Sequence, residues 1–85
     1  MMIMFTAYLN KGKNKGKPSN VKDYRLGADY IDVRFFGNPV IYRYSYIKTG
    51  QAHVEEMKRL AIDGEGLNSY IGKNFRKPGL FDKIY

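Results

Sequence analysis

Two neighbouring segments of the chain, residues 30–36 and 40–47, alternate apolar and polar side chains with a period of two. This pattern is typical of half-buried β-strands, because successive side chains of a strand point to opposite faces of its sheet. Pro39 has no N–H to give to a strand ladder, so we expect the connecting loop to end there, with Phe35 opposite Val40 as its closing pair. The two segments therefore predict an antiparallel hairpin at the centre of the fold.

The register of this hairpin decides which side chains share a face. It sets Val33 opposite Tyr42, Ile31 opposite Tyr44 and Asp32 opposite Arg43. The tyrosine row that includes Tyr42, Tyr44 and Tyr46 is then expected to face the core, while the charged face meets solvent or a ligand. Tyrosine rings also serve as stacking platforms for bases, so a ligand-facing position stays open as the alternative for these residues.

The segments before the hairpin predict two further strands. Residues 3–9 are apolar and suit a pleated surface, and residues 21–26 predict a second short strand that leads into a turn at 27–29. Between them, residues 10–20 combine four lysines with glycine and proline. This composition predicts a flexible basic loop.

Helical spacing begins after the hairpin. Apolar residues recur at i, i+3 and i+4 over residues 50–63, and Gly64 is a natural stop. A shorter helix is predicted over residues 66–73, and the Pro78-Gly79 pair is expected to end regular structure. The chain is thus predicted to be an α+β domain, with a small antiparallel sheet of three or four strands followed by two helices packed on one face.

The length of 85 residues allows one core, so residues 1–85 are expected to form a single domain. The chain has no cysteine, which removes disulfides and thiolate chemistry and fits a reducing compartment such as the cytoplasm. Homo-oligomerisation would supplement a core this small. The longest apolar run, residues 1–5, is far shorter than the roughly 20 residues that span a bilayer. We therefore expect a soluble cytoplasmic protein with no membrane contact.

The net charge of +7 favours nucleic acids, nucleotides or other polyanions as partners. Residues 1–25 contain six Lys/Arg and one acid, so most of the excess is local. Two interpretations of the lysine-rich loop stay open with equal weight. It is either a solvated segment that aids solubility or an arm that contacts an anion.

The chain shows no catalytic apparatus. Residues 12–18 differ from a phosphate-binding P-loop, because only three residues separate the glycines and proline replaces the metal-binding hydroxyl. His53 is the single histidine and is expected at the surface. Glu55 and Glu56 point to different sides of their helix, and Glu55 is expected to pair with Arg59. These features predict a protein that is not an enzyme and that holds no cofactor or metal.

A Tyr-x-Tyr stands on the second hairpin strand, at Tyr42 and Tyr44, and Gly64, Asn68 and Ile71 follow the first predicted helix. In this order the residues resemble the KTSC domain, a short module found alone and at the end of some lysyl-tRNA synthetases. The resemblance covers roughly residues 30–77 and departs from the family where a Gly-Leu pair replaces two aromatic residues. It implies an RNA-binding role.

These observations predict a binding module for an anionic partner, with RNA or another nucleic acid first. The residues expected to contact the nucleic acid or nucleotide are Lys11, Lys13, Lys15, Lys17, Arg34, Tyr42, Arg43, Tyr44, Asn68, Lys73, Arg76 and Lys77.

Two other functions stay open. One is a small oligomeric protein that binds or sequesters a nucleotide-like ligand between subunits, as some phage-encoded proteins do. The other is a protein–protein interaction module that uses an exposed edge strand within residues 3–9.

Overall fold

The two alternating segments form the centre of an antiparallel sheet. In the computed structural model, which describes residues 4–10, 20–75 and 79–84, they are β3 (Tyr30–Phe35) and β4 (Ile41–Ser45). The observed register pairs Val33 with Tyr42, Ile31 with Tyr44 and Asp32 with Arg43. The predicted hairpin register is therefore confirmed.

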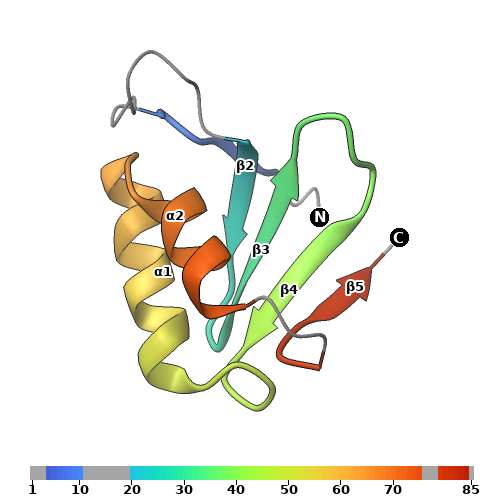
Figure 1. Cartoon of the computed structure of the whole chain (residues 1–85), viewed down its shortest axis with the longest axis vertical. Helices are drawn as coiled ribbons and strands as arrows, with labels where there is room; N and C mark the ends of the chain where they lie inside the picture. Colours follow the sequence, from blue (N-terminus) through green and yellow to red (C-terminus); the bar gives the residue numbers. More distant parts are fainter. Residues whose placement is uncertain (1–3, 11–19, 76–78, 85) are drawn as a thin grey trace.

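Three further strands extend the sheet on both sides of this hairpin (Figure 1). β2 (Val21–Leu26) pairs with β3, while β1 (Thr6–Ala7) and β5 (Asp82–Ile84) form the two edges. The strand order is β1-β2-β3-β4-β5, and all neighbours are antiparallel. The strand predicted over 21–26 is confirmed. Of the strand predicted over 3–9, the described residues form β1, and Tyr8 adds a backbone hydrogen bond to Lys22 of β2.

Both predicted helices form, and they cover one face of the sheet (Figure 1). α1 spans Gln51–Asp63 and α2 spans Leu67–Asn74. α1 ends at Gly64, which adopts the left-handed conformation with φ 85° that glycine accepts at little cost. The fold is thus a small α+β domain with one sheet and one helix layer. No described helix is long and apolar enough to cross a membrane.

The core lies between the helices and the sheet face that they cover. The strands contribute the buried residues Val21, Tyr24, Ile31, Val33 and Tyr44, and the helices contribute Val54, Met57, Ala61 and Leu67. Tyr44 and Ile31 are the largest of the fully buried side chains. The tyrosine row thus faces the core at its centre, as the alternation predicted.

β5 corrects the expectation that regular structure ends at residues 78–79. Asp82–Ile84 pairs with β4 and completes the sheet. A segment of this length is too short for alternation to be recognised in the sequence, and tertiary contacts fix it instead. The ring of Phe81 lies 5.6 Å from the ring of Tyr44, which anchors the start of β5 on the core.

Tyr8 ties the N-terminal segment to the helix layer. Its hydroxyl accepts a hydrogen bond of 3.2 Å from the N–H of Leu67, the first residue of α2. The N–H groups in the first turn of a helix have no partner within the helix, so Tyr8 satisfies one of them. Burial raises the pKa of Tyr8, which keeps this hydroxyl protonated. The segment before β2 therefore stabilises both the sheet edge and the start of α2.

Gly27 lies against the ring of Tyr30 at the turn between β2 and β3. Its N–H donates to the Tyr30 carbonyl at 2.9 Å. A Cβ atom at this position would come within 2.1 Å of Tyr30 Cε2. Non-bonded carbons prefer separations of about 3.5–4.0 Å, so only glycine fits while the ring keeps its place.

We expect Gly27→Ala to lower the free energy of unfolding by about 2 kcal/mol, because the added methyl group displaces the Tyr30 ring. Gly72→Ala is the matched control. It adds the same methyl group within α2, where nothing lies within 4 Å, and should raise stability by about 0.5–1 kcal/mol. Urea denaturation of both variants measures the difference. An unchanged midpoint for Gly27→Ala would show that Tyr30 moves without cost.

Candidate functional site

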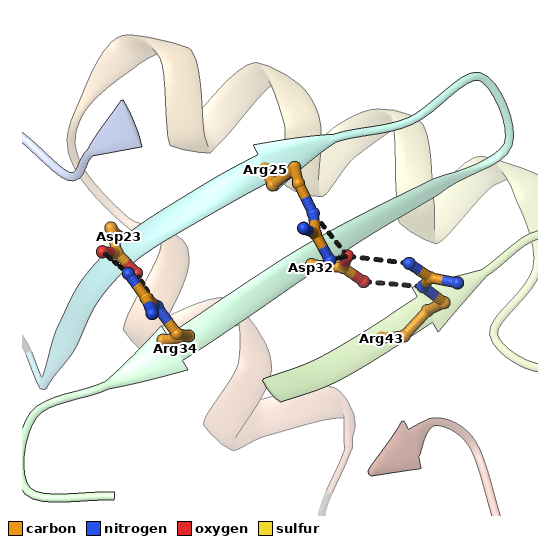
Figure 2. Close-up of polar contacts among 5 residues, drawn as sticks. All are labelled: Asp23, Arg25, Asp32, Arg34 and Arg43. Carbon is orange, nitrogen blue, oxygen red and sulfur yellow. Dashed lines mark hydrogen bonds and ion pairs between the residues drawn. The ribbon is translucent and has the colours of Figure 1, made fainter. Parts of the chain in front are cut away.

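The sheet face opposite the helices, the open face, carries a network of charged side chains (Figure 2). Strand pairing puts Asp23 beside Arg34, and it puts Arg25 and Arg43 on either side of Asp32. Successive side chains of a strand point to opposite faces of the sheet. The apolar residues of β2, β3 and β4 therefore lie on the core face, and these charged residues lie on the open face.

Asp32 is the centre of this network and is 0% exposed. Arg25 donates to its Oδ2 from Nε at 3.0 Å and from Nη2 at 2.7 Å. Arg43 donates from Nε to Oδ1 at 2.8 Å and from Nη2 to Oδ2 at 2.9 Å. The arginine triad, defined as Arg25, Asp32 and Arg43, thus holds one carboxylate between two guanidiniums that come from the two flanking strands (Figure 2).

A second ion pair lies beside the triad on the same face. Arg34 donates from Nε and Nη2 to the two carboxylate oxygens of Asp23, at 2.8 and 2.6 Å. Both bonds form a parallel fork, the geometry in which arginine and carboxylate match best. The hydrogen bond to Asp23 raises the pKa of Arg34, and the hydrogen bond to Asp32 does the same for Arg43. Both guanidiniums are therefore firmly cationic.

Two aromatic rings lie against these guanidiniums. The Arg43 guanidinium carbon lies 3.9 Å from the centroid of the Tyr30 ring. Phe5 contacts the other two arginines, with its ring centroid 3.9 Å from the Arg34 guanidinium and 4.6 Å from that of Arg25. Cation–π contacts of this kind favour the stacked orientation. The rings therefore fix the planes of all three guanidiniums.

The net charge of the chain comes mainly from two short segments of the sequence. The described residues contain nine lysines and arginines and all eight acids, so their formal charges nearly cancel. The other six basic residues belong to 11–19 and 76–78. These include the predicted contacts Lys11, Lys13, Lys15, Lys17, Arg76 and Lys77, which lie outside the described residues.

The remaining predicted site residues do not form one cluster. Arg34 and Arg43 lie on the open face, whereas Tyr42 and Tyr44 point to the core face of the same sheet. Tyr44 is 2% exposed, so it is a packing residue in this structure. Tyr42 is half-buried, and its hydroxyl accepts a hydrogen bond from Asn38 Nδ2 at 3.1 Å.

Asn68 and Lys73 are exposed on α2, in the helix layer. The sheet separates them from the open face, so they cannot act together with Arg34 and Arg43 on one small ligand. An extended partner that wraps around the edge of the sheet would be needed to contact both groups.

Sequence reasoning missed Arg25, Asp23 and Phe5 as members of the charged network. The register between β2 and β3 shifts between Val21 and Asp23, and this bulge breaks the alternation that would have revealed Arg25. By contrast, the position of Asp32 opposite Arg43 followed directly from the hairpin register.

The helix layer corrects two expectations about charged and polar residues. His53 is half-buried and not a surface residue, with Nδ1 at 2.6 Å from the Tyr70 hydroxyl and its ring against Phe75. Arg59 pairs with Glu56, at 2.5 Å, because the i+3 spacing aligns the two groups here better than the expected i+4 spacing from Glu55.

Glu55 instead accepts a hydrogen bond from the Tyr46 hydroxyl at 2.5 Å and lies 3.3 Å from Lys58 Nζ. The bond from Tyr46 lowers the pKa of Glu55, and the same bond raises the pKa of Tyr46. Among the described residues, no group of three or more histidines and acids could hold a metal ion.

No family model, curated protein or solved structure matches this chain. The resemblance to the KTSC domain therefore stays a prediction based on the residues quoted above. Any proposal for the function of the protein therefore rests on the geometry of the open face.

We expect Asp32→Asn to lower the free energy of unfolding by about 3–5 kcal/mol, because it leaves two partly buried guanidiniums without their counter-charge. Asp82→Asn is the control, since its pair with Lys48 is nearly half exposed on both sides and should cost less than about 1 kcal/mol. Urea denaturation at neutral pH measures both. Equal losses in the two variants would contradict a central role for Asp32.

Tyr44 should make the fold sensitive to alkali. Burial raises its pKa above the ordinary value near 10, so the unfolded chain deprotonates first as the pH rises. Stability is then fully present below about pH 10 and falls above it, by about 1.4 kcal/mol per pH unit for this group. Tyr44→Phe should flatten this decline, measured by urea denaturation between neutral and strongly alkaline pH. An identical decline in the variant would show that other tyrosines account for it.

Proposed function

We propose that this protein is a non-enzymatic, cytoplasmic binding module for nucleic acid, most readily RNA, and that the open face contacts the phosphate backbone. The observation that carries the proposal is the set of three guanidiniums on one uncovered sheet face, each fixed by a carboxylate and an aromatic ring. Fixed arginines suit phosphate, because the planar fork of donors matches two phosphate oxygens.

Two of the three arginines remain partly accessible although they are paired, whereas the side chain of Arg25 is only 17% exposed. The side chains of Arg34 and Arg43 are 33% and 31% exposed, whereas that of Asp32 is fully buried. An approaching anion therefore meets guanidinium before it meets carboxylate. The open face presents positive charge even though its ion pairs are nearly balanced.

The basic residues of 11–19 and 76–78 support the same proposal. They carry six positive charges and no acid. Clustered lysines and arginines provide the sequence-independent part of nucleic-acid affinity, through release of counterions from the phosphates. In this proposal they add affinity to the contacts that the open face provides.

A protein–protein interaction through β1 is the second candidate, because Thr6 and Ala7 are both exposed on a sheet edge. Within the described part of the chain, two residues of that edge pair with β2 and Tyr8 adds one backbone hydrogen bond to Lys22, so this edge offers few backbone hydrogen bonds to a partner strand. The open face has more contacts to offer, so nucleic acid is preferred.

The Arg43→Gln variant tests the proposed function. It removes one guanidinium, while Arg25 keeps its two hydrogen bonds to Asp32 Oδ2, and circular dichroism checks that the variant is folded. We expect affinity for single-stranded RNA to fall about tenfold, and the slope of log K against log salt concentration to decrease by about one. Fluorescence anisotropy at several salt concentrations measures both.

Arg59→Gln is the matched control, because it removes the same charge from an exposed position on α1, on the other side of the sheet. It should change affinity by less than about twofold. If both variants weaken binding equally, net charge and not the open face explains the affinity. If the unmodified protein binds no RNA at low ionic strength, the proposed function is wrong.

A further inference from the structure

We infer that the arginine triad is a binding site for a single phosphodiester group, contacted by the outer edges of Arg25 and Arg43. This inference rests on the proposed function and refines it, because it assigns the phosphate contact to one cluster and defines what the open face can recognise.

Charge balance distinguishes the triad from its neighbour. In the triad two guanidiniums share one carboxylate, so the cluster itself has a net charge of +1, which the exposed Asp29 offsets in part through its electrostatic interaction with Arg43. Asp82 lies opposite Arg43 in the next strand, but it is engaged by Lys48 at 3.0 Å. The Asp23–Arg34 pair is balanced by itself. A group with one negative charge therefore complements the triad and not the pair.

The geometry of the hydrogen bonds leaves donors for a ligand. Each guanidinium has five N–H donors, and both triad arginines use Nε and Nη2 toward Asp32. The edge formed by Nη1 and the second Nη2 hydrogen points away from the bound carboxylate. The two edges belong to β2 and β4, on either side of β3, and each can donate to one of the two free oxygens of a phosphodiester.

The site is also preorganised. Asp32 fixes both side chains, and Tyr30 lies against Arg43 while Gly27 allows the ring to sit close to the backbone. Side chains that are already ordered lose less entropy when a ligand binds. Asp32 and Tyr30 are thus positioning residues, which act on the phosphate through the arginines.

The composition of the open face limits what else it can recognise. The described strands place the following residues on this face: Ala7, Asp23, Arg25, Tyr30, Asp32, Arg34, Ile41, Arg43, Ser45, Asp82 and Ile84. None of these is Asn or Gln, the side chains that pair with adenine. Arginines occupy the carboxylates of Asp23 and Asp32, and Lys48 pairs with Asp82. Contacts to phosphate position a nucleic acid but carry no sequence information. The face therefore offers arginines that can contact phosphate, and guanine through the same fork of donors, but within the described strands it offers no side chain that pairs with adenine.

The test uses the whole chain and three labelled single strands of equal length, oligo(rU), oligo(rA) and oligo(dT), with inorganic polyphosphate as competitor. We expect the three affinities to agree within about threefold, and polyphosphate to displace each strand. Arg43→Lys keeps the charge but loses the planar fork, so it should bind about tenfold more weakly. Arg59→Lys should bind like the unmodified protein, and circular dichroism checks that both variants are folded.

The outcomes separate the inference from the proposed function. A preference above about tenfold for one strand, no displacement by polyphosphate, or full affinity of folded Arg43→Lys overturns the inference, while RNA binding itself still stands. The oligonucleotide affinities and the polyphosphate competition need no variant, so they test the inference even if Arg43→Lys unfolds. Failure of the unmodified protein to bind any strand overturns both.

Discussion

The burial of Asp32 is the constraint on which the sheet depends. A carboxylate that water cannot reach is tolerated only when cations pair with it, and here β2 and β4 each supply one arginine. A shift of one residue in either strand would carry that arginine to the core face and leave the carboxylate underpaired. The register that pairs Asp32 also sends Ile31 and Val33 into the core. Polar pairing on one face and apolar packing on the other therefore specify the same alignment.

The sequence correctly predicted those elements in which the pattern of apolar residues along the chain matches the side chains that are packed in the fold. The hairpin register followed from strict alternation with Pro39 at the loop, and α1 followed from helical spacing that ends at Gly64. β5 was missed because three residues carry too little pattern, and its place depends on Phe81 packing against distant rings. Arg34 and Arg43 lie on strands that alternate regularly, and both were predicted as candidates. Arg25 was missed because the bulge in β2 interrupts the alternation.

The N-terminal segment links the candidate site to the core. Phe5 lies against Arg25 and Arg34 on the open face, and three residues later Tyr8 reaches the start of α2 on the opposite side. Because successive side chains of an extended chain alternate, one short edge segment contacts both faces of the sheet. The order of the open face is therefore coupled to the helix layer, although no helix covers that face.

In the proposed function, the basic segments 11–19 and 76–78 and the open face contribute to binding in different ways. The described residues are nearly neutral, so their field is short-ranged, whereas 11–19 and 76–78 carry most of the net charge. In the proposed function, the net charge governs how often a polyanion encounters the protein, a rate that salt lowers steeply. The lifetime of the complex depends instead on close, oriented contacts, which the fixed arginines of the open face are placed to provide. In the proposed function, long-range attraction and close contact with the polyanion thus depend on different residues.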